Sequence, residues 1–294
     1  MKIVSMNNFF LILFIFFTST IFAQRGNTTL IAEYEDTLKI ISKKIMTDEL
    51  EKNRRIANDA FITHLDEVLK FEKSFEYPFD SLQTVSVITS PDNEFRIFTW
   101  MLRKRNGTYE YFGRVQLKKK NRIKIFNLND SSKNIRNPEI KELDNNNWFG
   151  GIIYDIIYNK SSKGKYYTLL IWDGNDHYST KKIIDIMQFN ANKIVFGKSI
   201  FKGKETNTKR IILEYDGKSS ISLKYDKDHK RIVFDHLVAS NTQLEGLYEY
   251  YIPDGTFDAF KFEKGSWFFQ KDVDIRSNQK IIEYKKPKTD LIPQ

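Results

Sequence analysis

Apolar side chains recur every three or four positions between residues 30 and 71. They are Leu30, Tyr34, Leu38, Ile41 and Ile45, followed by Ala57, Phe61, Leu65, Val68 and Phe71. This spacing places them on one face of an amphipathic helix. Thr47 and Asp48 interrupt the pattern, and Glu51, three residues after Asp48, completes the pattern of a capping box with Asp48 as the N-cap. The sequence therefore predicts two helices joined near residues 46–48, ending before Pro78 because proline cannot continue a helix.

From Leu82 onward the period of the apolar residues changes to two, which is typical of half-buried β-strands. Such runs cover residues 84–89, 95–102, 109–118, 122–126, 151–158, 166–172, 182–189, 193–196, 210–215, 220–225, 231–236, 248–252, 257–262 and 266–270. Turn-forming pairs lie between them, namely Asn106-Gly107, Asp173-Gly174, Asp216-Gly217, Asp254-Gly255 and Lys264-Gly265. Short strands at this spacing predict antiparallel meanders.

The predicted fold is therefore mainly β, an antiparallel meander preceded by an N-terminal α-helical hairpin. Radial repetition of the meander would give a small propeller, whereas folding it over on itself would give a sandwich or barrel, and both alternatives stay open. We expect a helical segment over residues 24–80 and a β-rich domain over 81–294. Residues 126–147 are polar and rich in turn-forming types, so they predict a long surface excursion.

The N-terminus has the pattern of a secretory signal peptide. Lys2 precedes a continuous apolar run at residues 9–17, and Ala23 is a suitable last residue before cleavage, with Gln24 beginning the mature chain. The apolar stretch is shorter than the ~20 residues of a spanning helix, which disfavours an uncleaved anchor. The sequence predicts a signal peptide at residues 1–23, cleaved near Ala23, and a bacterial protein exported to the periplasm or beyond, with no stable transmembrane segment afterwards.

Composition narrows the possible chemistry. The 294-residue chain contains no cysteine, which excludes disulfides, thiol nucleophiles, a lipid-modified cysteine and cysteine-ligated zinc. The formal net charge is +9. However, the densest basic run, Lys118–Lys124, coincides with a predicted hairpin turn and is interpreted as solvated surface. Export disfavours a nucleic-acid partner, while an acidic glycan or an anionic envelope surface remains open.

The densest group of chemically active side chains follows Trp172. It contains Asp173, Asp176 and His177 on a predicted loop. A calcium loop requires oxygen ligands at alternating positions, but His177 stands where the third oxygen would be. An Asp-Gly hairpin whose side chains cap their own backbone explains the pattern more simply.

Asp235-His236 ends a predicted strand, and a separate acidic turn at residues 252–258 contains Asp254 and Asp258, which are candidate ligand-binding residues. An aspartate can orient an imidazole for base catalysis. The chain nevertheless lacks a nucleophile elbow, a zinc-binding helix motif, a P-loop and a dinucleotide fingerprint. We therefore predict no metal and no cofactor.

Aromatic residues are abundant, with 24 Phe, 15 Tyr and 4 Trp. Most are expected to pack in the β core. Trp148, which follows three asparagines, is expected to be the exception, and with Trp172 it is a candidate for stacking on a ligand.

Several segments together resemble a family of uncharacterised secreted bacterial proteins. They are Tyr77–Leu82, Ser90–Asp92 leading to Phe95–Trp100, Leu169–Gly174, Val233–Leu237 and Pro253–Gly255. The resemblance implies one integrated architecture over the mature chain and carries no activity or site residue.

These observations favour a non-enzymatic binding or scaffolding module whose partner is an envelope protein or a glycan. The alternative is a hydrolase that acts on glycans or peptides through Asp173, Asp176, His177, Asp235 and His236.

Overall fold

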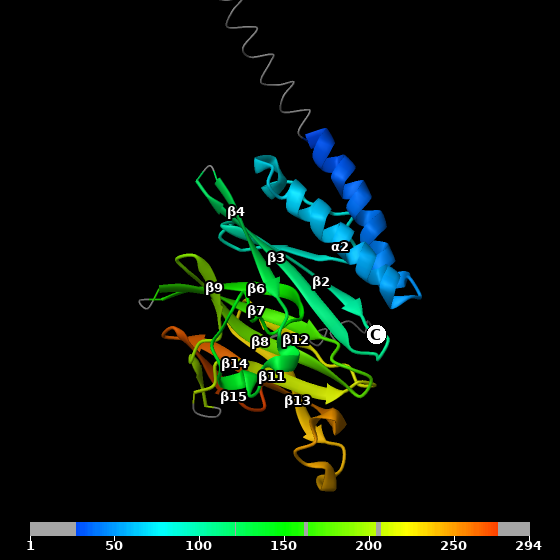
Figure 1. Ribbon diagram of the computed structural model, residues 1–294. Helices are drawn as coiled ribbons and strands as arrows, with labels where there is room; N and C mark the ends of the chain where they lie inside the picture. The colour runs from blue at the N-terminus through cyan, green and yellow to red at the C-terminus, as the bar shows by residue number, and fades with distance from the viewer. Residues whose placement is uncertain (1–27, 121, 162–163, 204–206, 276–294) are drawn as a thin grey trace, which may run out of the picture.

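The computed structural model describes residues 28–120, 122–161, 164–203 and 207–275 (Figure 1). The predicted signal peptide lies outside these residues. The described chain is mostly β, with two N-terminal helices followed by three sheets. Within this part of the chain, no helix has both the length and the apolar character needed to cross a membrane.

The helical hairpin is confirmed, although its cap differs from the prediction. The first helix covers residues 28–47, and α2 covers Glu51–Val68. Leu50, rather than Asp48, is the N-cap of α2, and Asp48 instead accepts a hydrogen bond from the Leu50 N–H at 3.0 Å. Glu51 does not complete a capping box, because its carboxylate accepts from the Arg105 N–H at 2.7 Å and so ties α2 to the β domain. The 3₁₀ helix η1 (Glu72–Phe75) follows.

The first sheet has the order β1-β2-β3-β4, an antiparallel meander as predicted. Its strands are β1 (Ser86–Thr89), β2 (Phe95–Arg103), β3 (Tyr109–Lys119) and β4 (Arg122–Asn129). The short 3₁₀ helices η2 (Ser132–Asn134) and η3 (Pro138–Ile140) lead to the next sheet.

The middle sheet has the order β5-β9-β8-β7-β6, and β11 pairs with the part of β8 that β9 leaves free. Its strands are β5 (Leu143–Asp144), β6 (Ile152–Ser161), β7 (Gly164–Asp173), β8 (Ser179–Asn190), β9 (Lys193–Phe196) and β11 (Ile211–Asp216).

The last sheet has the order β10-β15-β14-β13-β12, with β10 and β15 parallel and the other pairs antiparallel. Its strands are β10 (Phe201–Lys202), β12 (Leu223–Asp226), β13 (Arg231–Ala239), β14 (Tyr251–Glu263) and β15 (Ser266–Gln270). The 3₁₀ helices η4 (Thr242–Leu244) and η5 (Tyr248–Tyr250) lie between β13 and β14.

The elements stack as four layers in the order helices, first sheet, middle sheet and last sheet (Figure 1). Each interface has its own apolar cluster. Phe61 and Trp100 meet between α2 and the first sheet, Phe95 and Tyr167 meet between the first and middle sheets, and Tyr166 lies in the cluster between the middle and last sheets. The sheets form no closed barrel, and the architecture agrees with the sandwich alternative.

Two local predictions need correction. The surface excursion predicted for residues 126–147 is shorter, because Phe126 and Leu128 belong to β4 and, with Leu143 of β5, enter the apolar cluster between the first and middle sheets. Residues 131–142 lie outside the strands, and none of them is buried. The Asp254-Gly255 pair is not a hairpin turn, because β14 runs continuously from Tyr251 to Glu263.

Candidate functional site

The β7–β8 turn contains the predicted Asp173–His177 group, but Asp173 has a structural role. It is 5% exposed, and its Oδ1 accepts hydrogen bonds from the Tyr111 hydroxyl at 2.7 Å and from the Asn175 N–H at 2.8 Å. The Gly174 N–H donates to the same Tyr111 oxygen at 2.8 Å. Burial raises the pKa of Asp173 and that of Tyr111. Asp173 thus ties the middle sheet to β3 of the first sheet and is withdrawn from solvent.

The other members of this group point in different directions. Asp176 Oδ1 accepts from the N–H groups of Tyr178 and Ser179, which confirms the self-capping turn. His177 is exposed and lies over Gly107 in the β2–β3 turn, where a Cβ on that glycine would lie 1.9 Å from the imidazole Nε2. Of this group, Asp176 lines the pocket described next.

An open pocket of about 400 Å³ lies beside this turn. It is lined by side chains from three distant segments, namely Asp176, Tyr178, Ser179, Glu214, Glu249 and Tyr250. The β7–β8 turn and the adjoining start of β8, strand β11, and η5 supply these residues. We refer to it below as the tyrosine pocket.

Hydrogen bonds fix the acceptors of the tyrosine pocket on its middle-sheet side. The Ser179 hydroxyl donates to Glu214 Oε1 at 2.5 Å, and Lys181 Nζ lies 3.6 Å from Glu214 Oε2. Lys181 also donates to Asn175 Oδ1 at 2.9 Å, and the Asn175 amide donates to the Ser179 oxygen at 2.6 Å. Lys181 and Glu214 face each other in the β8–β11 register, so regular strand pairing brings them together. The Glu214 carboxylate is therefore held in place by β8 and partly neutralised.

The opposite wall of the tyrosine pocket comes from residues 240–250, which project beyond the last sheet (Figure 1). The ends of this segment are joined by a hydrogen bond from the Ser240 N–H to the Tyr250 carbonyl at 3.0 Å. The N–H of Gly246 donates to the Tyr251 hydroxyl at 3.1 Å. These bonds position η5 and its tyrosines relative to the strands.

Tyrosine rings at the pocket are open to solvent. Tyr178 is 75% exposed and Tyr250 is 43% exposed. Tyr248, also in η5, is 56% exposed but does not line the pocket. Exposed aromatic rings beside fixed polar acceptors are the features with which proteins bind small polar ligands that have an apolar face.

His236 has a different partner from the one predicted. Its Nδ1 lies 2.8 Å from Oδ2 of Asp258, while Asp235 accepts from the Ser222 N–H at 2.6 Å. Asp258 is 3% exposed, and its Oδ1 accepts from the Asp272 N–H at 3.1 Å. Asp254 is exposed and accepts from the Thr256 N–H at 2.9 Å, and this bond lowers the pKa of Asp254. No hydrogen bond or ion pair of the described residues links His236 to the β7–β8 turn.

The two candidate tryptophans do not form a ligand platform. Trp148 is fully buried, at 0% exposed, so the expectation of an exposed ring is wrong. Residues Asp130 and Trp148 form a β-bridge that draws the ring into the core between the first and middle sheets. Trp172 is half-buried and packs against Tyr109, with ring centroids 6.2 Å apart.

Among the described residues, no three His, Asp or Glu side chains are arranged to hold a metal ion. Comparisons with protein-family models, curated proteins and solved structures found no match. The resemblance to a secreted bacterial family therefore stays a prediction, and the functional argument depends on geometry alone.

The sequence analysis missed most of the tyrosine pocket. Glu214 and Tyr250 were interpreted only as members of predicted strands, and Glu249 likewise. Tyr178 was detectable, since an aromatic residue within a polar turn has no strand partner to cover it.

Proposed function

We propose that this chain is an exported, non-enzymatic binding module whose tyrosine pocket takes a carbohydrate. The observation that carries the proposal is the combination of exposed Tyr178 and Tyr250 rings with acceptors that the fold holds in place. An aromatic face packs against the apolar C–H face of a sugar ring, and carboxylate oxygens accept hydrogen bonds from its hydroxyls.

Two carboxylates of the tyrosine pocket are fixed as hydrogen-bond acceptors, as recognition of a polyol requires. Asp176 accepts two backbone N–H groups, and Glu214 is engaged by Ser179 and Lys181. Their remaining lone pairs are directed acceptors for the hydroxyls of a ligand. Acceptors that are fixed before binding reduce the entropy lost when a ligand binds.

The test is binding of the purified protein to an oligosaccharide array, followed by calorimetry on the sugars retained. Tyr178→Ala and Tyr250→Ala should each weaken binding about 2- to 10-fold, the value of a lost aromatic contact of ~0.5–1.5 kcal/mol. Tyr248→Ala is the matched control, because it removes an exposed tyrosine of the same segment outside the pocket. Equal losses in all three variants, or retention of basic peptides in place of sugars, would contradict the proposal.

Export is part of the proposal and has its own test. It is supported by Lys2, the apolar run at residues 9–17 and the small residue Ala23 that follows. Mass spectrometry of the protein from fractionated cells should find a chain beginning near Gln24 outside the cytoplasm. An intact Met1 terminus in the cytoplasmic fraction would refute export.

The paired His236 and Asp258 favour a hydrolase as the second candidate function. A buried carboxylate that accepts from Nδ1 fixes the imidazole and leaves Nε2 to take a proton from water or a substrate hydroxyl. His236→Gln should then abolish hydrolysis of glycans or peptides while leaving sugar binding at the tyrosine pocket unchanged. Equal product release by both proteins would remove His236 from a catalytic role.

A further inference from the structure

Six hairpin turns from all three sheets lie at the same end of the molecule, which we call the hairpin end. It comprises the β1–β2, β3–β4, β6–β7, β8–β9, β12–β13 and β14–β15 turns (Figure 1). Lys124 Nζ of β4 donates to Asn192 Oδ1 in the β8–β9 turn at 3.4 Å. The Tyr166 hydroxyl of β7 donates to the Gly265 carbonyl in the β14–β15 turn at 3.1 Å.

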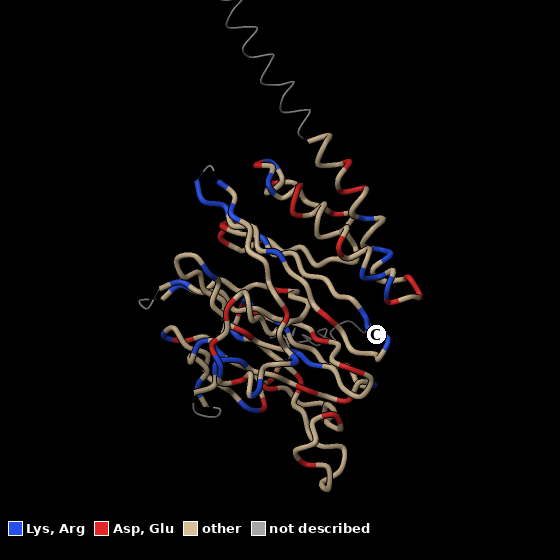
Figure 2. Tube along the Cα trace, viewed as in Figure 1, with Lys and Arg blue, Asp and Glu red and all other residues tan. Residues whose placement is uncertain are grey.

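The hairpin end is rich in cations. Lys and Arg concentrate at these hairpin tips (Figure 2). Some are paired: Lys118 contacts Glu76, Lys165 contacts Glu94 and Asp92, Lys193 lies 3.8 Å from Asp144, and Lys261 lies 2.8 Å from Glu263. Six others form no ion pair with any described residue, namely Lys119, Lys120, Arg122, Lys124, Lys160 and Lys264. Of the acids at this end, Asp228 is exposed and forms no ion pair with a described residue, but the unpaired cations outnumber it and an excess of positive charge remains.

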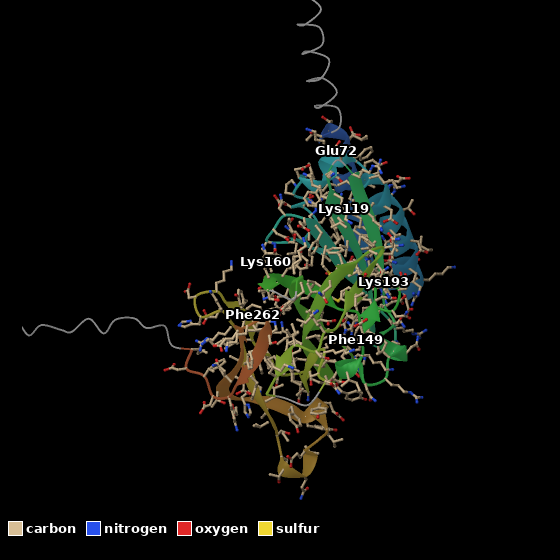
Figure 3. All side chains as sticks on the ribbon, turned by 90° about the vertical axis from the view of Figure 1, so that its left-hand side faces the viewer. Glu72, Lys119, Phe149, Lys160, Lys193 and Phe262 are labelled. Atoms are coloured by element: carbon tan, nitrogen blue, oxygen red, sulfur yellow. The ribbon has the colours of Figure 1, made fainter. Side chains whose placement is uncertain are left out.

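The cations of the hairpin end are spread in two dimensions. Figure 3 looks onto this end and shows Lys119, Lys160 and Lys193 apart from one another, at the corners of a triangle on three separate hairpins. Lys119 and Lys160 are unpaired, whereas Lys193 lies near Asp144. A single polyanionic strand follows one line, whereas a lipid surface offers phosphates to all corners at once.

The types of the unpaired cationic residues suit binding to a lipid surface, whose headgroups are mobile. Five of the six unpaired cations are lysines, which act as point charges on flexible stems. Arginine forks, which recognise a single phosphate in fixed geometry, would indicate a specific site instead. Clustered lysines near an anionic leaflet are attracted without any defined pocket.

We propose that the hairpin end docks on an anionic lipid surface. The hairpin tips approach the headgroups first, with Arg122 and Lys124 on either side of the half-buried Ile123 at the β3–β4 tip. This contact is independent of the sugar proposed for the tyrosine pocket.

The test is co-sedimentation with vesicles of phosphatidylcholine, either alone or with about 30% phosphatidylglycerol, a composition that supplies the anionic charge. The variant Lys119→Gln/Lys120→Gln/Arg122→Gln should bind the anionic vesicles about 100-fold more weakly, since each cation near the surface contributes about 5-fold. The matched control is Lys39→Gln/Lys43→Gln/Lys52→Gln, which removes the same charge from exposed positions of the helical layer. Every protein begins at Gln24, the start of the proposed mature chain, so that the apolar run at residues 9–17 adds no membrane binding of its own.

Binding of the unmodified protein to anionic vesicles should also fall steeply as salt rises from about 50 to 300 mM, because added ions screen exposed charges. Equal losses in the two triple variants, or binding independent of phosphatidylglycerol, would overturn the proposal. Retention on an acidic polysaccharide or on DNA with no vesicle binding would overturn it as well.

Discussion

The buried ion pair between Asp185 and Arg210 permits a quantitative prediction about stability. Both side chains are 0% exposed, and Arg210 Nε donates to Asp185 Oδ2 at 2.7 Å. Arg210 Nη1 also donates to the Pro138 carbonyl at 2.5 Å, so the guanidinium joins η3 to the centre of β8. The Arg210→Met variant keeps an apolar stem but leaves the carboxylate of Asp185 buried without its cation.

This change should lower the free energy of unfolding by about 3–5 kcal/mol, the usual cost of breaking a buried pair. If the free energy of unfolding decreases by about 3 kcal/mol per M urea, the urea concentration at the unfolding midpoint would fall by about 1–1.7 M. The double variant Asp185→Leu/Arg210→Met should recover most of the loss, because no charge remains buried. The unmatched Pro138 carbonyl leaves a residual deficit of about 1 kcal/mol.

The pH dependence of the Arg210→Met variant is a second readout of the same experiment. Burial raises the pKa of Asp185, and Arg210 opposes that effect. Without the arginine the folded-state pKa rises further above the unfolded value, so the folded state holds the proton more tightly and loses stability as pH rises. The deficit relative to the unmodified protein should therefore shrink between pH 7 and pH 5.

A loss below about 1 kcal/mol for Arg210→Met, far under the cost expected for an uncompensated buried charge, would contradict this prediction. A double variant as unstable as the single one would contradict it as well, since the loss would then arise from packing and not from charge.

Three other substitutions test contacts between layers by urea unfolding. Asn58→Ala removes the acceptor of the buried Trp100 indole N–H, 2.8 Å away, and should cost about 1–3 kcal/mol. Tyr111→Phe removes the hydroxyl that donates to the buried carboxylate at the end of β7, with a similar cost of about 1–3 kcal/mol. Gly107→Ala places a Cβ on a residue with φ +81° and displaces the His177 ring, so the free energy of unfolding should fall by about 1 kcal/mol. Adding His177→Ala to this variant should relieve the clash with the ring but not the backbone strain at residue 107. Unchanged midpoints in these variants would contradict the stated contacts.

The apolar pattern predicted the elements well because the buried faces are continuous. Strand β2 reads as a nearly unbroken apolar run and is buried on both faces. Phe95 and Ile97 face the middle sheet, while Phe98 and Trp100 face the helices. The apolar pattern thus predicted the strands, but it could not show how the strands divide among three sheets or that a helical layer covers the first sheet.

The error at β14 shows what local preferences cannot determine. Pro253, Asp254 and Gly255 are turn-forming residues, yet Asp235 pairs with Phe257 and Leu237 pairs with Pro253. Three residues of β14 therefore face a single residue of β13, which is a bulge in a continuous strand. The pairing with β13 overrides the local turn preference, and it brings His236 to Asp258 rather than to its neighbour Asp235.

The tyrosine pocket could not be predicted from the sequence, for a related reason. Ser179, Glu214 and Tyr250 lie far apart in the sequence, and only the pairing of β8 with β11, together with the fold of residues 240–250, brings them together. The Asp173–His177 group was conspicuous because its polar residues are consecutive. Consecutive polar residues in a turn satisfy their own backbone, however, and that is what Asp173 and Asp176 do.

The sign of the charge at each end of the middle sheet, in contrast, could be predicted from the order of its turns. In an antiparallel meander successive turns alternate between the two ends, so the β6–β7 and β8–β9 turns share one end and the β7–β8 turn lies at the other. The first two contain Lys160, Lys165 and Lys193, whereas the last contains Asp173 and Asp176. Docking of the hairpin end on anionic lipid would therefore hold the tyrosine pocket at the far end of the same strands, open to solvent. Occupation of the pocket by a soluble sugar should then be unaffected by vesicles, and competition between the two would show that they share a surface.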